Sequence, residues 1–444
     1  YMPANLGKGD EIKLFTTATD DATAVALAGD ANTSLNDTAV IDYVASSTDD
    51  DVHITAVAKS TSTIASEQKI TVNQAKSLSE AFSASILGDS GAQTAFETVF
   101  NAGSASTTNA DFAKQLAPQT DTISGSSVAT RAMTGTVQGI VSNRMASLRS
   151  GDAYVTGMSA GNGMSANSGF IQAFGSESEQ KNTKSKGATV FGFDSDTSGV
   201  AIGFDGMTDN GSTLGLSASY STTDVDGKGT GKSKNSIDSY TVSVYADKAT
   251  ENGYVEGSLT YGINDNTASR LVNTAGLDRT YSANYDSSQI SLKVGGGVPN
   301  EVADSTFVTP FASATATSIS TDAYTETSTT ADDALRLKVA QDDINSLVGT
   351  VGVKAHMVTD KGTPMISLAL NNEFGDNQIN SNNTFQGGGT KFKTTTDLEE
   401  LSATLGLGYS FGNDVTSLNI NYEANANDDE YVSHYGSVKI VAKF

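Results

Sequence analysis

One short motif in this chain carries the residue types of nucleophilic catalysis. Gly88-Asp89-Ser90-Gly91 has the order found around the nucleophile of serine proteases. Such a serine needs a histidine base and a carboxylate that orients it. The chain has only three histidines, His53, His356 and His434, and the last two fall in an expected strand and near an expected loop. The motif therefore predicts a helix-breaking turn and no catalytic site.

Two other segments contain groups that could bind phosphate or calcium. Gly229-Thr230-Gly231-Lys232-Ser233 has the composition of a phosphate loop, but Asp226 stands where that loop needs a glycine, and no helix is expected to follow. Asp224-Val225-Asp226-Gly227 and Asp194-Ser195-Asp196 offer carboxylates to calcium without the rest of the ligand pattern. The chain has no cysteine, which removes thiolate metal sites. We expect solvated loops here, and no enzyme activity, cofactor or metal.

The charge balance limits the partners of the chain. Its 51 acidic and 27 basic residues give a formal net charge of −24. Nucleic-acid binding needs basic patches, so we exclude it and expect the acidic residues to solvate loops. No segment approaches the ~20 apolar residues of a membrane-spanning helix. The sequence begins at Tyr1 without a visible signal segment, so we interpret it as a processed or truncated chain.

The C-terminal strand gives the clearest indication of the fold that would position any functional group. Its apolar residues alternate with a second row at 437, 439, 441 and 443, and many other strands, such as 401–411, alternate in the same way. Because the second row is often Gly, Ser, Thr or Asn, the pattern is typical of a barrel with lipid outside and water inside. The apolar row of the last strand consists of Val438, Ile440, Ala442 and Phe444. We expect this row to face lipid and to mark the strand for assembly into the bacterial outer membrane.

Residues 164–444 contain about twelve strand candidates, and their connections alternate in length. Outer-membrane barrels have short periplasmic turns and longer external loops. The short connections are 208–211, 248–253, 299–304, 359–362 and 412–414, and the others are mostly longer. The sequence therefore predicts an all-β membrane protein, a 12-stranded antiparallel transmembrane β-barrel with both barrel ends on the periplasmic side.

Upstream of the barrel, the apolar residues recur at the spacing of a helix and no longer at every second position. Apolar residues at i, i+4, i+7 and i+8 indicate an amphipathic helix; they are Met133, Val137, Ile140, Val141, Met145 and Leu148. Residues 124–149 would form a helix ~39 Å long, which exceeds the ~25 Å apolar band of an outer membrane. A helix ~10–12 Å wide would largely fill a lumen of this strand number. Residues 1–66 read as short strands, too few for a comfortable independent core.

The end of this helix carries recognisable residues. A helix that ends in Arg144-Met145-x-x-Leu148-Arg149, then a Gly-rich segment and a barrel, resembles the translocator domain of autotransporters of the type V secretion class. The segment 112–119 resembles the linker before that domain's helix, and residues 1–66 resemble the last rungs of a passenger β-solenoid. The resemblance implies four parts: a solenoid-like passenger end (1–66), a helical linker (67–122), a pore helix (123–150) and the translocator barrel (164–444).

The resemblance also implies a function. It is a translocator and anchor in the bacterial outer membrane that exports and displays its own N-terminal passenger at the cell surface. The implied partners are outer-membrane lipid and lipopolysaccharide, the barrel assembly machinery, periplasmic chaperones and the passenger itself. Two alternatives stay open: the anchor of a structural or adhesive surface-layer protein, and a diffusion porin, which would lack a segment like residues 1–150.

One departure from the resemblance concerns self-cleavage. Some relatives cut themselves inside the pore helix at an Asn-Asn pair, a few residues before the Arg-Met. The corresponding positions here hold Gly139 and Ile140. Self-cleavage at asparagine needs its side-chain amide, which neither residue has, so we expect the chain to stay continuous.

Overall fold

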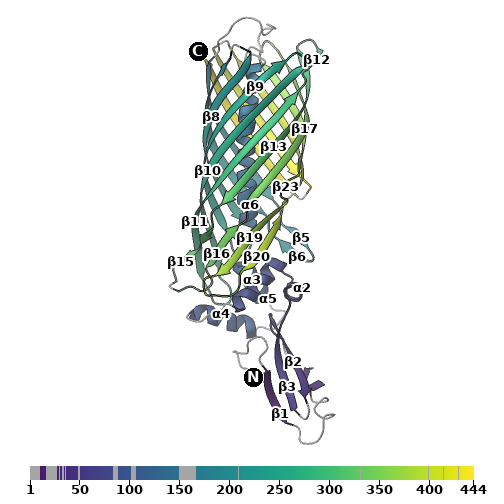
Figure 1. Cartoon of the computed structure of the whole chain (residues 1–444), viewed down its shortest axis with the longest axis vertical. Helices are drawn as coiled ribbons and strands as arrows, with labels where there is room; N and C mark the ends of the chain where they lie inside the picture. The colour runs from purple at the N-terminus through teal and green to yellow at the C-terminus, as the bar shows by residue number, and fades with distance from the viewer. Residues whose placement is uncertain are drawn as a thin grey trace.

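The strands of the second half close into a barrel (Figure 1). The computed structural model describes residues 11–16, 28–29, 31–32, 35, 37–48, 51–83, 89–101, 107–149, 167–208, 210–330, 332–398, 400–413, 415–428 and 430–444. Twelve strands form the wall, each antiparallel to its neighbours, and the pairing of the last strand with the first closes it. In order they are β4 (Ser168–Gln180), β7 (Phe193–Met207), β8 (Ser212–Gly227), β9 (Lys234–Thr250), β10 (Gly253–Val272), β11 (Arg279–Gly297), β13 (Thr306–Thr321), β17 (Ile344–Met357), β18 (Thr363–Glu373), β21 (Leu401–Gly412), β22 (Thr416–Asn427) and β23 (Tyr431–Lys443). The predicted strand number and antiparallel arrangement are confirmed.

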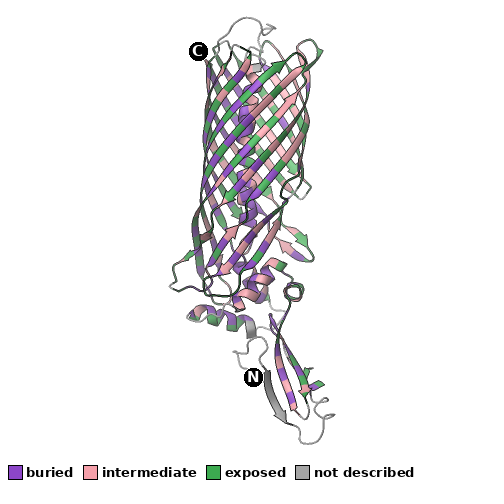
Figure 2. Ribbon diagram, viewed as in Figure 1, coloured by how far each residue is buried: buried purple, intermediate pink, exposed green. Residues whose placement is uncertain are grey.

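Burial alternates along these strands as the sequence pattern requires. In β8, the even positions Leu214, Leu216 and Tyr220 are exposed while Ser217 and Ser221 are buried. Figure 2 shows the same alternation around the visible wall. Large apolar side chains are thus turned outward, and small polar ones are turned toward the lumen. Such a surface is stable in lipid and would aggregate in water.

The ends of the strands at the long connections differ from the prediction. The sequence pattern placed loops at 222–237 and 265–286, whereas β8 continues to Gly227, β10 to Val272, and β11 starts at Arg279. Further short strands occupy the connections within 176–197, 318–345 and 374–397 at this end: β5 (Thr183–Ser185), β6 (Ala188–Val190), β14 (Tyr324–Thr325), β15 (Thr327–Ser328), β16 (Leu337–Gln341), β19 (Gln378–Phe385) and β20 (Phe392–Asp397). The segments predicted as loops are therefore largely strand: some extend the barrel strands, whereas β14, β16, β19 and β20 form a sheet of their own, and so do β5 and β6. Because the long connections of such barrels are external, we call this end the outer end.

The opposite, periplasmic end agrees with the short turns predicted there. Strand β7 ends at Met207 and β8 begins at Ser212, and β9 and β10 are separated by residues 251–252 alone. The small strand β12 (Asn300–Ala303) lies in the turn before β13. Both the start of β4 and the C-terminal end of β23 lie at this end (Figure 1).

A long helix passes through the barrel. Helix α6 (Thr120–Arg149) has 30 residues, and so is ~45 Å long. Its expected bounds of 123–150 agree closely, although residue 150 and the Gly-rich segment after it lie outside the described residues. The helix is visible between the strands in Figure 1 and contacts β7, β8, β9 and β10. The predicted N-terminal helix in the pore is confirmed.

Four shorter helices cover the outer end. They are α2 (Thr61–Gln68), α3 (Val72–Ser83), α4 (Ser90–Asn101) and α5 (Thr107–Leu116). Their buried faces share one apolar cluster with the outer ends of the barrel strands, including Leu78 of α3, Phe112 of α5, Val272 of β10 and Tyr281 of β11. We call helices α2–α5 the outer cap.

The first strands differ from the solenoid-like arrangement that the resemblance implied. Strands β1 (Glu11–Thr16) and β2 (Ile41–Thr48) both pair with β3 (Asp51–Ala58), and both pairings are antiparallel. A solenoid stacks its rungs in parallel, whereas β2 and β3 form a tight hairpin. Residues 1–10 and 17–27 of the same segment lie outside the described residues. The assignment of residues 1–66 to a passenger therefore stays a prediction.

Candidate functional site

The apolar stripe of α6 lies against one side of the lumen. Met133, Val137 and Ile140 pack with Phe170 and Phe174 of β4. One turn further on, Val141 and Met145 pack against Tyr245 of β9. Leu148 is half-buried, and Arg149 ends the helix with a side chain outside the described part. The stripe read from the sequence is thus the face by which the helix contacts the wall.

A buried ion pair joins the periplasmic end of the helix to the barrel wall. The Arg144 guanidinium donates to both carboxylate oxygens of Asp205 in β7, at 2.7 and 2.9 Å, and the pair is fully buried. Arg144 also donates to the hydroxyl of Ser168, which itself donates to Asp205 at 2.6 Å. Tyr245 Oη completes the network with a bond to Asp205 at 2.8 Å. Such two-pronged pairs fix orientation as well as position.

The middle of the helix is also held by polar contacts with other strands. Gln138 Nε2 donates to Ser291 Oγ of β11 at 2.7 Å. Arg131 forms an ion pair with Glu373 of β18, which also accepts a bond from Ser346 Oγ at 2.6 Å. The helix is therefore tied to the wall on more than one side. Only Arg144 among these groups was singled out from the sequence.

The outer end of the helix is held by a carboxylate. Asp121 accepts bonds from the backbone N–H of Gly229 and from Ser233 Oγ, both at 2.9 Å. These two residues belong to the segment that has the composition of a phosphate loop. The segment is a tight turn between β8 and β9, in which Lys232 has a left-handed φ of 43°. The turn therefore binds the side chain of Asp121 in the place where a phosphate loop would bind a phosphate.

The two aspartate motifs lie in strands and not in the expected loops, and they are neighbours: Asp194 of β7 pairs with Asp226 of β8, and Asp196 pairs with Asp224. The described residues of the serine-protease motif, in contrast, are not joined by a histidine. Asp89 accepts a bond from the backbone N–H of Ala92 at 2.9 Å and so caps α4. His53 lies in β3, the His356 ring stacks on Phe307, and His434 bonds the Tyr422 hydroxyl. Among the described residues, no group of three or more acidic, histidine or cysteine side chains could hold a metal ion. The same part of the chain has no helix that is long and apolar enough to cross a membrane.

The apolar row of the last strand faces outward. Val438 and Ile440 are about half exposed, Ala442 is exposed, and Phe444 is 69% exposed. The Phe444 ring lies 5.5 Å from that of Phe204, also on the outer face. The alternate residues Lys439 and Val441 are buried in the lumen. The row is therefore placed where lipid would contact it.

The outer cap is fixed to the barrel by buried charges. Asp89 of the cap accepts two bonds of 2.6 Å from Arg279 of β11, and Arg279 also pairs with Asp333 at 2.8 Å. Burial raises the pKa of Asp89, but the bonds from Arg279, Ala92 and Ala334 outweigh it and lower the pKa to about 2, below the ordinary 3.8. The ionised form is thus the one that the folded cap stabilises.

This shift predicts that acid loosens the outer cap. A carboxylate with a lowered pKa in the folded state stabilises it above the ordinary pKa, and the contribution of about 2 kcal/mol is lost as the pH falls from about 4 toward 2. We expect proteolysis within α4 to accelerate over that range. Asp89→Asn should show the fast rate already at pH 7, whereas Asp111→Asn, which removes a half-exposed pair with Lys114, should not. A pH-independent rate in the unaltered chain would contradict the assignment.

The chain is similar to known proteins in both sequence and structure. Residues 169–423 match a family described as Autotransporter beta-domain. The structure is similar to the translocator domain of the autotransporter NalP from Neisseria meningitidis, with a TM-score of 0.55 and 17% identity over 72% of this chain and 98% of that one. The sequence is 27% identical over 271 residues to "Outer membrane protein A" of both Rickettsia conorii and Rickettsia rickettsii. That match covers 58% of this chain and 12–13% of the relatives' length.

A closed antiparallel barrel with its own N-terminal helix in the lumen defines the class of outer-membrane translocator barrels. The match to the family model extends over more than half of the chain. The chain belongs to the autotransporter family, as its resemblance predicted, and its barrel is that family's outer-membrane domain.

Proposed function

We propose that this chain is the membrane anchor through which its own N-terminal passenger is exported, and that it keeps that passenger covalently attached at the cell surface. The observation that carries the proposal is the path of α6. The helix starts at the outer end beside the turn at Gly229, runs through the lumen and reaches Asp205 near the periplasmic end. A chain on this path has its N-terminal part outside the membrane.

The alternatives differ in what they require of the lumen. A diffusion porin needs an open lumen, whereas α6 lies along most of this one and is bonded to several strands. The adhesive surface-layer reading concerns the passenger and is compatible with the anchor. Continuity of the chain is supported by the side chains at the expected cleavage point, Gly139 and Ile140, since neither carries an amide.

A mass-spectrometric experiment tests this proposal. Trypsin cleaves after Arg131 and Arg144, so the peptide 132–144 contains both Gly139 and Ile140. We expect this peptide at the same abundance as barrel peptides in protein extracted from native outer membranes, and an N-terminal epitope accessible on intact cells. A new N-terminus within 131–149 on most molecules would show that the passenger is released.

The terminal row leads to a prediction about assembly. We propose that Val438, Ile440, Ala442 and Phe444 are recognised by the barrel assembly machinery after delivery by periplasmic chaperones. Deleting Phe444 should greatly reduce the fraction of heat-modifiable barrel and leave protease-sensitive chain in the periplasm. Phe411→Ala is the matched control, because Phe411 is also an outward aromatic side chain but belongs to β21. Normal barrel yield without Phe444 would refute this role.

A further inference from the structure

The helix does not occupy the lumen evenly. Its packed face lies toward β4, β7, β8 and β9. The opposite face borders a cavity of about 390 Å³. On the helix, this cavity is lined by Arg131, Gly135, Gln138, Gly139, Ser142 and Asn143. A Cβ built on Gly135 or Gly139 would have no atom within 4 Å, so the helix faces open space at these two turns.

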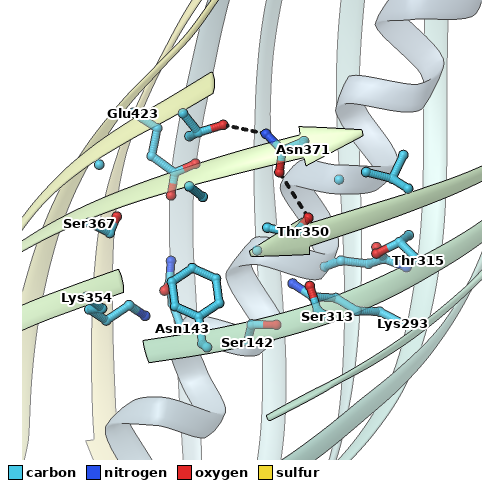
Figure 3. A pocket seen from close by; sticks show the side chains of 18 of the residues that line it. Ser142, Asn143, Lys293, Ser313, Thr315, Thr350, Lys354, Ser367, Asn371 and Glu423 are labelled. Carbon is cyan, nitrogen blue, oxygen red and sulfur yellow. Dashed lines mark hydrogen bonds between the residues drawn. The ribbon is translucent and has the colours of Figure 1, made fainter. Parts of the chain in front are cut away.

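The far wall of this inner cavity carries charged and polar side chains beside apolar ones such as Phe311 and Leu407. Figure 3 shows the side chains of Lys293, Lys354 and Glu423 around the space beside the helix, together with Asn371, which bonds Thr350 at 2.9 Å. A polar cavity of this volume holds on the order of ten or more waters. The inner cavity is therefore large enough, and has enough polar groups, to be filled by water.

A second cavity continues the first toward the outer end. It has a volume of about 230 Å³ and shares Arg131, Val348 and Asn371 with the inner cavity. On the helix it begins at Thr120, so the two cavities together extend along residues 120–143, which is ~35 Å. This length exceeds the ~25 Å apolar band of an outer membrane.

The point where the two cavities meet is occupied by the ion pair of Arg131 and Glu373. Arg131 borders both cavities, and Glu373 borders the outer one. The Glu373 carboxylate is held by the backbone N–H groups of Leu347 at 2.6 Å and Gly375 at 2.9 Å. A fixed carboxylate on the wall thus holds a long side chain of the helix across the lumen at this point.

We propose that the barrel conducts water and small hydrated inorganic ions while α6 stays in place, along the face of the helix that contains Gly135 and Gly139. The Arg131–Glu373 pair is the constriction, the narrowest point of this path. The inner cavity carries Lys293 and Lys354 beside Glu256 and Glu423. With Arg131, the lining has three cationic and two anionic side chains, and Arg131 is itself paired with Glu373. This near balance of charge gives little preference between cations and anions. This activity goes beyond display of a passenger and does not depend on it.

Conductance of the purified full chain in planar bilayers, with potassium chloride as the probe, tests the constriction. The double variant Arg131→Gln/Glu373→Gln removes both charges together and leaves no unpaired one. We expect its steady conductance to rise about twofold, since a pore's narrowest section limits the flow. Lys234→Gln is the control, because its pair with Asp226 lies on the exposed outer surface of the barrel. Unchanged conductance of a correctly folded double variant would overturn the assignment.

Cysteine labelling tests the path itself, because the chain has no cysteine of its own. Gly139→Cys places a thiol in the inner cavity, and a charged methanethiosulfonate reagent should attach there and lower the conductance. Val137→Cys places a thiol on the packed face, where the side chain is 3% exposed, and should react far more slowly. Equal reaction of the two thiols would mean that the helix leaves the lumen. No reaction at Gly139→Cys would mean that the cavity is closed to ions. Either result would overturn the proposal.

Discussion

Replacing Arg144 by Ala is expected to release the periplasmic end of the pore helix and open the lumen. The change removes the guanidinium that pairs with Asp205, a carboxylate whose side chain is fully buried. Removing one partner of a buried pair typically costs about 3–5 kcal/mol, because the other charge is left without compensation. We therefore expect large, frequent openings in single-channel recordings, in place of the small conductance of the filled barrel.

The design of this experiment separates loss of the ion pair from loss of the barrel. Heat-modifiable migration should persist in Arg144→Ala, because Arg144 is on the helix and the wall closes through β23 and β4. The double variant Arg144→Gln/Asp205→Asn replaces the charges by groups that can still hydrogen-bond, and should recover most of the closed state. Arg144→Ala barrels that conduct like the unaltered protein would show that the apolar stripe alone holds the helix.

Leu405→Arg is expected to destabilise the barrel by about 2–4 kcal/mol, the cost of an arginine facing lipid near the midplane. Leu405 is 41% exposed on the outer face of β21, directly opposite Leu368 of β18, which is 55% exposed. Thr404, one residue earlier, lines the inner cavity. Thr404→Arg should therefore change stability far less, since its charge can be hydrated.

The free energy of unfolding in lipid vesicles, measured by guanidinium titration, distinguishes the two variants. Because they differ by one position in the same strand, local strand propensity is nearly matched between them. Equal destabilisation would mean that the inside and outside rows of β21 are assigned the wrong way round.

The strand bounds were predicted most accurately where the outward-facing residues contact lipid and are therefore apolar. The periplasmic ends of the strands were placed within three residues, since the apolar row continues to the turn. At the outer end, a strand such as β10 continues to Val272, eight residues past its predicted end at 264. Beyond the membrane both faces of a strand meet water or the cap, so alternation no longer marks the strand.

The functional site was predicted only in part, for a related reason. The apolar stripe of α6 follows from helical periodicity, which is local in the sequence. The partners Asp205 and Glu373 lie 61 and 242 residues away from their arginines, so the spacing of residues could not pair them. One signal was present: Asp205 is a single carboxylate in the lumen-facing row of β7, among small and apolar residues. A charge at such a position has to be paired in the lumen.

The shared core of the outer cap and the barrel has a mechanical consequence. Side chains of β2, β3, the cap helices and the outer barrel strands belong to one apolar cluster, and Arg279 ties the cap to the wall as well. A force applied to the β2–β3 hairpin is therefore shared among many contacts between the cap and the barrel wall before it acts on α6. The connection between the hairpin and the barrel is rigid, so the two should move together. Drag on the surface-exposed part would tilt the whole barrel in the membrane before it drew the helix out.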